Sequence, residues 1–185
     1  IAFSHRPSLG ASARAAEITG HGEAAAKVVR LAALRHFINL SGQANAVRQR
    51  MPGDASTRSY ARVIGDQGSL VLMNSPPRPD GPAIHNGRSY SAAVHLAEDV
   101  RPFVALANGL RRQGFSAPAV YHADLDAGFL LLEDLGGATF VQGTPPEPIG
   151  ERYQAAATML AALHAIDLPD PLPPAPKINY RIPAF

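Results

Sequence analysis

Cysteine is absent from the 185 residues, and aromatic residues make up only 6% of them. The lack of cysteine excludes disulfides, thiolate metal sites and cysteine nucleophiles, and it suits a reducing cytoplasm. Long apolar runs are missing too, because no stretch approaches the roughly 18 residues that a membrane span needs. The formal net charge of +2 is too small to predict a nucleic-acid partner. We therefore expect a cytoplasmic protein without membrane or direct nucleic-acid contacts.

Apolar residues are plentiful, at 46% of the chain, so a hydrophobic core can form. Three segments at residues 46–51, 57–65 and 69–74 are separated by the turn sequences "PGDAS" and "DQG" and predict three strands. A helix is expected from about Asp99 to Arg112, followed by two strands, "APAVYHA" and "GFLLLED". The compact solution for these elements is an α+β fold, a five-stranded antiparallel sheet with one packed helix.

The two ends of the chain predict simpler elements. "IAFSHRP" reads as the end of a strand, and apolar residues at helical spacing predict a helix within residues 18–42. One strand and one helix cannot enclose a core, so residues 1–40 are expected to be the remnant of a larger domain. Near the other end, "TPPEP" predicts a loop and "ERYQAAATMLAALHAI" a helix. The last stretch, from residue 167 onward, is so dense in proline that we expect an extended linker.

Five motifs occur in an informative order: "GDASTRSYARV", "SLVLMNSPP", "PFVALANGLRRQGFSAP", "GFLLLEDLG" and "LAALHAID". With them the chain resembles the aminoglycoside phosphotransferase and choline kinase superfamily, a relative of the protein kinases. The branch it most resembles contains the anomeric kinases of N-acetylmuramate and N-acetylglucosamine. The resemblance implies a protein-kinase-like N-lobe and hinge over residues 46–137 and the start of a helical C-lobe over 138–185. It also implies ATP, magnesium and a sugar acceptor as ligands.

The abrupt change from apolar residues to acids in "GFLLLEDLGG" is typical of a kinase-like hinge. The resemblance implies that adenine binds the main-chain N–H and C=O groups of Glu133, Asp134 and Leu135, which would be left unpaired just past Leu132. The two acidic side chains are then expected to point to solvent or toward the ribose. Without the other motifs, an ordinary strand ending at a surface turn would explain the same residues.

Phosphate contacts are expected from the turn between the first two strands. Its short residues, Gly53, Asp54, Ala55 and Ser56, let the backbone approach a polyphosphate, although a plain hairpin turn is the alternative. The kinase Lys–Glu pair is missing, since Met73 and Asn74 occupy the lysine's place and Phe103, Val104 and Ala105 the glutamate's. Arg58 and Arg62 share one strand face with Tyr60 and are the candidate replacement cations, unless that face is simply solvated.

Phosphoryl transfer needs an Asp to orient the acceptor, and Asn and Asp groups to hold magnesium. In this superfamily they come from an "HGDxxxxN" loop and a later Asp, and neither motif occurs in the sequence. We therefore expect no catalytic residue and no metal ligand here, but a kinase cut through its C-lobe and inactive alone. The magnesium ligands would come from the missing part.

The N-terminal piece has a resemblance of its own. "IAFSHRP…ARAAEITGHGEAAAKVVRL" is similar to the tail of the TsaE-type bacterial ATPase subunit for tRNA threonylcarbamoyladenosine synthesis, which some bacteria fuse to a sugar-kinase-like phosphotransferase. A remnant of a P-loop-type α/β domain would then occupy residues 1–40, whereas a helical lead-in of the kinase is the alternative. Two other functions stay open: a non-catalytic kinase-like interaction module, and a protein whose main role is the tRNA-modification ATPase.

Overall fold

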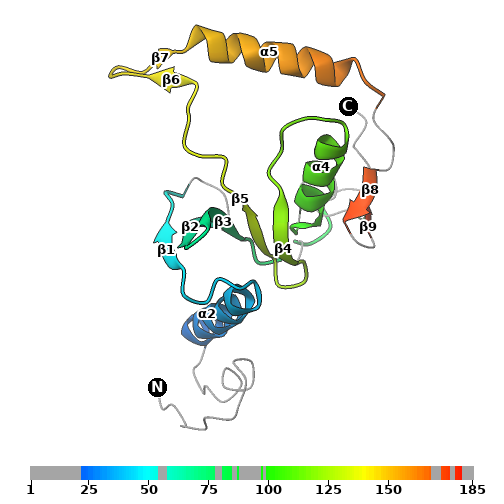
Figure 1. Ribbon diagram of the computed structural model, residues 1–185. Helices are drawn as coiled ribbons and strands as arrows, with labels where there is room; N and C mark the ends of the chain where they lie inside the picture. Colours follow the sequence, from blue (N-terminus) through cyan, green and yellow to red (C-terminus); the bar gives the residue numbers. More distant parts are fainter. Residues whose placement is uncertain are drawn as a thin grey trace.

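The computed structural model describes residues 22–53, 58–77, 81–84, 87, 97, 99–167, 172–175 and 178–180. Its centre is a five-stranded antiparallel sheet with the strand order β1-β2-β3-β5-β4 (Figure 1). The strands are β1 (Val47–Arg50), β2 (Ser59–Gly65), β3 (Gly68–Asn74), β4 (Val120–Asp124) and β5 (Phe129–Glu133). The five-stranded antiparallel sheet expected from the sequence is therefore confirmed, and β5 lies between β3 and β4.

Helix α2 (Glu23–Leu40) covers one face of this sheet. A buried cluster joins the helix to strands β2, β3 and β5, and its members are Leu34, Phe37, Ile38, Val63, Leu72, Phe129 and Leu131. Phe129 and Leu131 of β5 are two positions apart and both belong to the cluster, because successive strand residues point to opposite faces. The N-terminal helix thus shares the core of the sheet, although residues 1–21, including the expected first strand, lie outside the described residues.

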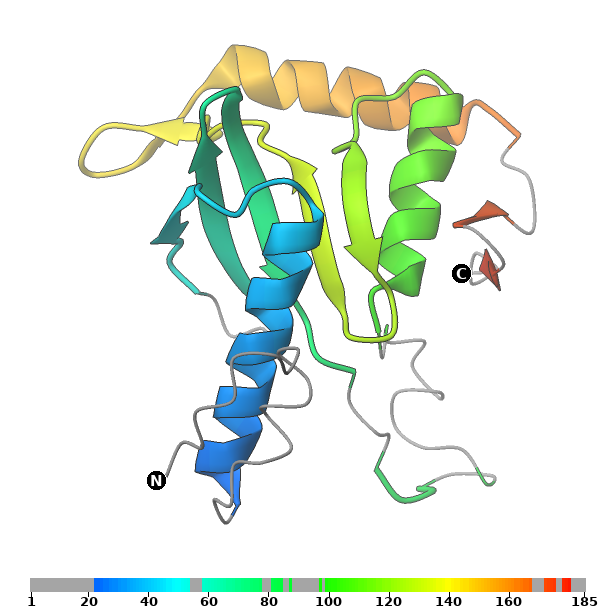
Figure 2. The same ribbon diagram turned by 60° about the horizontal axis from the view of Figure 1, so that its bottom comes forward.

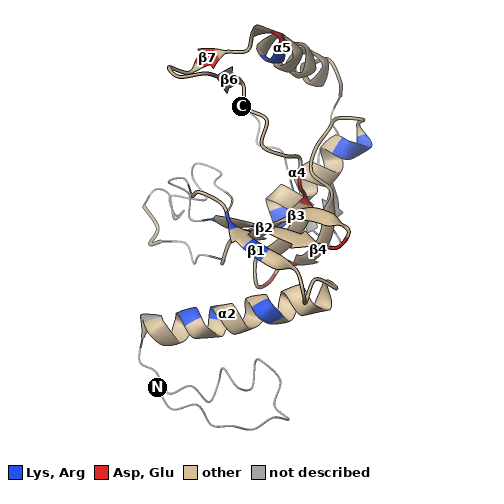
Figure 3. Cartoon of the chain, turned by 60° about the vertical axis from the view of Figure 1, so that its left-hand side comes forward, with Lys and Arg blue, Asp and Glu red and all other residues tan. Residues whose placement is uncertain are grey.

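Helix α4 (Arg101–Arg112) covers the opposite face, so the sheet lies between the two helices (Figures 2 and 3). The second cluster consists of Met73, Val100, Val104, Leu130 and Leu132. The sequence predicted one packed helix, and the structure has one on each face. Pro102 lies in the first turn of α4, where its missing N–H has no helical partner to lose.

The C-terminal part departs from the predictions in two places. Part of the expected proline loop forms a two-stranded ribbon of β6 (Val141–Gln142) and β7 (Glu147–Pro148). The two described parts of the expected linker form a second ribbon, β8 (Leu172–Ala175) with β9 (Ile178–Tyr180), which lies beside α4 (Figure 1). Proline is tolerated because each strand of a two-stranded ribbon has one open edge, where no N–H is needed.

Helix α5 (Gly150–His164) confirms the last predicted helix and buries none of its residues. Figures 1 and 3 show it apart from the central sheet. Among the described residues, no helix has the length and hydropathy required to cross a membrane.

Candidate functional site

Strand β5 is buried on both faces over four consecutive residues. Phe129 and Leu131 face α2, whereas Leu130 and Leu132 face α4, and none is more than 4% exposed. A strand enclosed between two helices must be apolar along its whole length, which explains the run "FLLL". The strand leaves this enclosed region at Glu133, which is partly exposed.

Glu133 makes an unusual exchange of hydrogen bonds with Ala119. Its main-chain N–H donates to the Ala119 carbonyl at 2.9 Å, so the prediction of an unpaired N–H at Glu133 is wrong. In an antiparallel ladder the Ala119 N–H would return a bond to the Glu133 main-chain carbonyl. It donates instead to the Glu133 carboxylate, Oε2, at 3.0 Å. The main-chain carbonyl of Glu133 is thereby left without this partner.

Arg111, in the last turn of α4, supports the same arrangement. Its Nη1 donates to the Ala117 carbonyl at 2.9 Å and lies 3.4 Å from Glu133 Oε2. The carboxylate of Glu133 is therefore engaged at the end of the sheet and does not point freely to solvent, as the sequence had suggested. It links the exit of β5 to helix α4 and to the chain entering β4.

Asp134 is held by three donors on the α4 side of the sheet. Its carboxylate lies 2.6 Å from Arg62 Nε and 3.3 Å from Arg62 Nη2, and it also accepts the Ser69 hydroxyl and the Gly136 N–H, the latter at 2.9 Å. The hydrogen bond from Arg62, followed by those from Ser69 and Gly136, lowers the pKa of Asp134 to about 2. The expectation of a side chain directed to solvent or ribose is wrong for Asp134, whose side chain is 9% exposed.

The main chain of Leu135, two residues past the sheet exit at Glu133, is unengaged. Its N–H and C=O make no hydrogen bond with any described residue, and its side chain is 57% exposed. In an extended chain, residues two apart present their main-chain groups to the same side. An extended segment therefore places the Glu133 carbonyl and the Leu135 N–H on the same side.

The chain matches the phosphotransferase enzyme family over residues 47–183. It belongs to that family. The match begins with β1 and includes the sheet, α4, the Glu133–Leu135 segment and α5. Helix α2 precedes the matched residues although it shares the core of the sheet.

Two relatives are both named N-acetylmuramate/N-acetylglucosamine kinase. The protein of Caulobacter vibrioides is 38% identical over 153 residues, which cover 76% of this chain and 41% of the relative. The protein of Pseudomonas aeruginosa is 35% identical over 120 residues, which cover 65% of this chain and 30% of the relative. This phosphotransferase-family chain thus spans less than half the length of either relative.

The two candidate phosphate cations occupy different positions in the phosphotransferase sheet. Arg62 pairs with Val71 in the β2–β3 register and is held by Asp134, close to the exit of β5. Arg58 precedes β2, whose first residue pairs with Asn74 at the opposite end of the sheet, beside the β1–β2 turn. Arg62 is therefore the poorer candidate for phosphate, and Arg58, which is half-buried and has other interactions, is the better placed.

The predicted phosphate-facing turn lies mostly outside the described residues. Asp54, Ala55 and Ser56 are among the residues not described. Gly53 is exposed, and a Cβ added to it would meet nothing within 4 Å, so no neighbour requires glycine there. The structure thus places only the edge of this turn, after β1.

The place of the kinase Lys–Glu pair is filled by an apolar contact. Met73 is 1% exposed and belongs to the same buried cluster as Val104 of α4, with Phe103 packed against it. Asn74 points to the other face, where its side chain binds Arg30. Losing both charged partners together avoids an unpaired buried charge.

Sequence reasoning missed Arg30 of α2 altogether. Its guanidinium bonds Asn74 Oδ1 at 3.0 Å through Nε, donates to the Ala127 carbonyl, and lies over the Phe129 ring at 3.7 Å. Burial lowers the pKa of this arginine. No local signal could have found it, because all of these partners are at least 44 residues away in the chain.

A metal centre built from side chains is not evident in the part of the chain that the structure describes. No group of three or more His, Asp or Glu residues gathers there with the spacing of metal ligands.

Proposed function

We propose that this chain is the ATP-binding lobe of a phosphotransferase that transfers the γ-phosphoryl group of ATP to a sugar hydroxyl. The observation that carries the proposal is the main-chain pair formed by the Glu133 carbonyl and the Leu135 N–H. Adenine carries an amine donor beside ring-nitrogen acceptors. One carbonyl and one N–H on the same side of the segment complement that edge.

The acceptor class rests on the relatives. Both carry the name of kinases for N-acetylmuramate and N-acetylglucosamine, so an amino sugar is the proposed acceptor here. Magnesium belongs to the same proposal, with ligands supplied by an "HGDxxxxN" loop and a later Asp that these 185 residues do not contain. A cytoplasmic site of action, where ATP is abundant, completes the proposal.

A non-catalytic module is the second candidate, favoured by the Met73–Val104 contact. Without the lysine, the phosphates lack the cation that protein kinases use. Such a module would keep the fold and use its surface for interactions. Nucleotide binding separates the two candidates, because only the first requires it.

The origin of residues 1–40 in a TsaE-type ATPase subunit is a further proposal. It is supported by the sequence similarity of that segment, whereas the packing of α2 on the sheet favours the alternative of a lead-in that belongs to the kinase lobe. Deleting residues 1–40 and measuring the unfolding transition of the rest tests the alternative. If these residues are a lead-in that belongs to the lobe, their deletion must lower the thermal midpoint strongly, since α2 contributes Leu34, Phe37 and Ile38 to the core.

Titration calorimetry with ADP, on the chain and on two variants of Leu135, tests the ATP-binding lobe. Leu135→Pro removes the main-chain N–H, whereas Leu135→Ala keeps it and is the matched control. We expect saturable binding to the unaltered chain, affinity for Leu135→Pro weakened about tenfold or more, and little change for Leu135→Ala.

Two results would contradict the proposal. If the folded chain binds neither ADP nor ATP, the proposal of an ATP-binding lobe is excluded and the interaction module is favoured. Equal affinity of Leu135→Pro and the unaltered chain would show that nucleotide binds elsewhere. Circular dichroism of both variants establishes that they are folded.

A further inference from the structure

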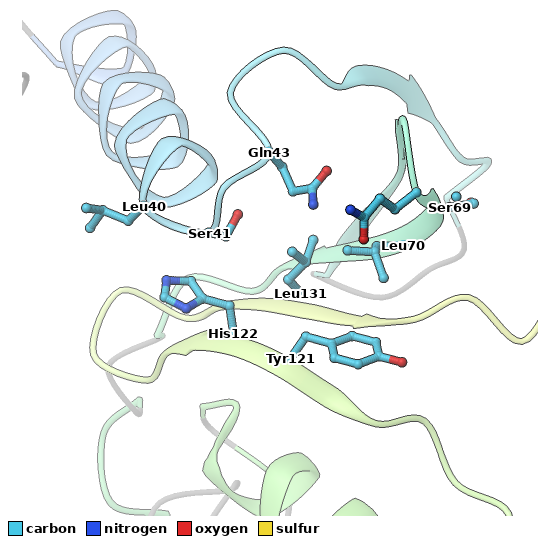
Figure 4. A pocket seen from close by; sticks show the side chains of 10 residues that line it. Leu40, Ser41, Gln43, Ser69, Leu70, Tyr121, His122 and Leu131 are labelled. Carbon is cyan, nitrogen blue, oxygen red and sulfur yellow. The ribbon is translucent and has the colours of Figure 1, made fainter.

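A cavity of about 480 Å³ lies between the end of α2 and the sheet. Its walls come from Ser41 and Gln43 after α2, Gln67 in the β2–β3 turn, Tyr121 and His122 on β4, and Leu131 on β5 (Figure 4). The volume falls in the range typical of small-molecule sites, about 300–1,000 Å³.

This cavity opens on the other face of the sheet from the proposed nucleotide site, and Ser69 borders both, since it lines the cavity and donates its hydroxyl to Asp134. Leu70 and Leu131, which line it, belong to the packing around the α2 cluster, whereas Leu132 faces α4 and Asp134 is bound to Arg62 on that side. Among the residues that the structure describes, no Lys, Arg, Asp or Glu lines the cavity. A phosphate-bearing ligand would therefore meet no countercharge in it.

A β-bulge directs two ring side chains of β4 into the same cavity. The register of β4 against β5 shifts between Val120 and His122, which makes Tyr121 the extra residue. In a regular strand, adjacent residues point to opposite faces. Here Tyr121 and His122 both line the cavity, and the His122 ring lies 4.8 Å from Phe37 of α2. Bulges often re-aim a side chain in this way beside binding sites.

Two side-chain amides enter from the opposite wall. Gln43 reaches toward the sheet from the chain between α2 and β1, and a Cβ at Gly65 would lie only 2.7 Å from Gln43 Oε1 (Figure 4). Glycine at the end of β2 therefore leaves room for this amide. Gln67 contributes a second amide from the β2–β3 turn, and Ser41 a hydroxyl. Each amide offers donors and an acceptor.

We propose that this cavity binds an uncharged small molecule rich in hydroxyl or amide groups, about the size of a monosaccharide. The amides and the hydroxyl satisfy its polar groups, and the Tyr121 ring, in a residue 60% exposed, supplies an apolar face for its C–H surface. The site does not depend on nucleotide binding. It lies on the face opposite α4, so its occupant is not the phosphoryl acceptor.

Nuclear magnetic resonance of the ¹⁵N-labelled chain tests the site, with N-acetylglucosamine as the probe because it carries both hydroxyl and amide groups. We expect saturable shifts of the side-chain amide signals of Gln43 and Gln67. Tyr121→Ala removes the ring face and should weaken binding about three- to tenfold. Tyr153→Ala, an exposed tyrosine on α5, is the matched control and should bind as the unaltered chain does.

The 6-phosphate of the same sugar supplies the charge test, and we expect it to bind more weakly than the uncharged sugar. Unmoved Gln43 and Gln67 signals up to the solubility limit of the sugar would overturn the proposal. So would unchanged affinity in Tyr121→Ala, or equal affinity for the phosphate ester. Should Tyr121→Ala fail to fold, Gln67→Ala in the exposed turn replaces it, with the same expected loss of affinity.

Discussion

Arg62 on β2 and Asp134, the residue after β5, form an ion pair with 2.6 Å between Arg62 Nε and Asp134 Oδ2. The pair ties the end of a buried central strand to its second neighbour across β3. Ser69 of β3 donates its hydroxyl to the same carboxylate. The abrupt change from leucines to acids therefore has a structural reason: the acidic side chains anchor the exit of β5.

Acid should weaken this anchor. The pKa of Asp134 is lowered to about 2 in the folded chain, against an ordinary value of about 3.9. The stability that ionised Asp134 contributes is fully present at pH values above about 3.9, and it is lost as the pH falls from there toward 2. We expect the thermal midpoint of the unaltered chain to exceed that of Asp134→Asn at pH 7, and the difference to shrink below about pH 4. A difference that is constant across this range would contradict the assignment.

Removing Arg30 should destabilise the sheet by uncoupling α2 from it. Arg30→Ala loses the bond to Asn74 Oδ1 and the contact with the Phe129 ring, so we expect the free energy of unfolding to fall by roughly 1–3 kcal/mol. Arg35→Ala, at an exposed position of the same helix, should change it by less than about 0.5 kcal/mol. Urea denaturation measures both values, and equal effects would show that helix propensity alone is responsible.

Gly128 should tolerate no side chain at all. Its φ is 71°, and an added Cβ would lie 2.0 Å from the Ser75 carbonyl oxygen. Gly114 has a similar φ of 84° but nothing within 4 Å of its Cβ position. We expect Gly114→Ala to cost about 1 kcal/mol of unfolding free energy, from backbone strain alone, and Gly128→Ala at least about 3 kcal/mol. Similar denaturation midpoints for the two variants would contradict the close approach of Ser75.

Glu133 should set the preference for adenine, if the proposed nucleotide site is correct. In Glu133→Ala the Ala119 N–H loses the carboxylate and is expected to bond the main-chain carbonyl, which then no longer accepts the adenine amine. The unaltered chain should therefore prefer ADP to inosine diphosphate, which lacks that amine, and Glu133→Ala should lose the preference. Glu151→Ala on exposed α5 is the control. Retention of the preference in Glu133→Ala would exclude the role of the carboxylate, while nucleotide binding itself could still hold.

Much of the fold could be predicted because its signals are local. The five strands follow from segments bounded by turn sequences, and α4 from the residue types at its two ends. The ribbon of β8 and β9 could not be predicted, since proline density argues against strands unless both have an open edge. For the candidate site, the position of Glu133 and Leu135 at the exit of β5 followed from the apolar run, but the hydrogen bonds of Glu133 with Ala119 did not.

The sequence by itself determined the order of the elements from α2 to β5, the buried β5 and the absence of the kinase lysine, since each depends on residue type or short-range period. Tertiary structure alone decided that neither acid points freely to solvent, because Asp134 meets Arg62 across 72 positions of the chain and Glu133 bonds Ala119. It also decided that α2 belongs to the core, through the contacts of Arg30 and Phe37 with distant strands. Such contacts depend on which chain segments the sheet brings together, and no local pattern records that.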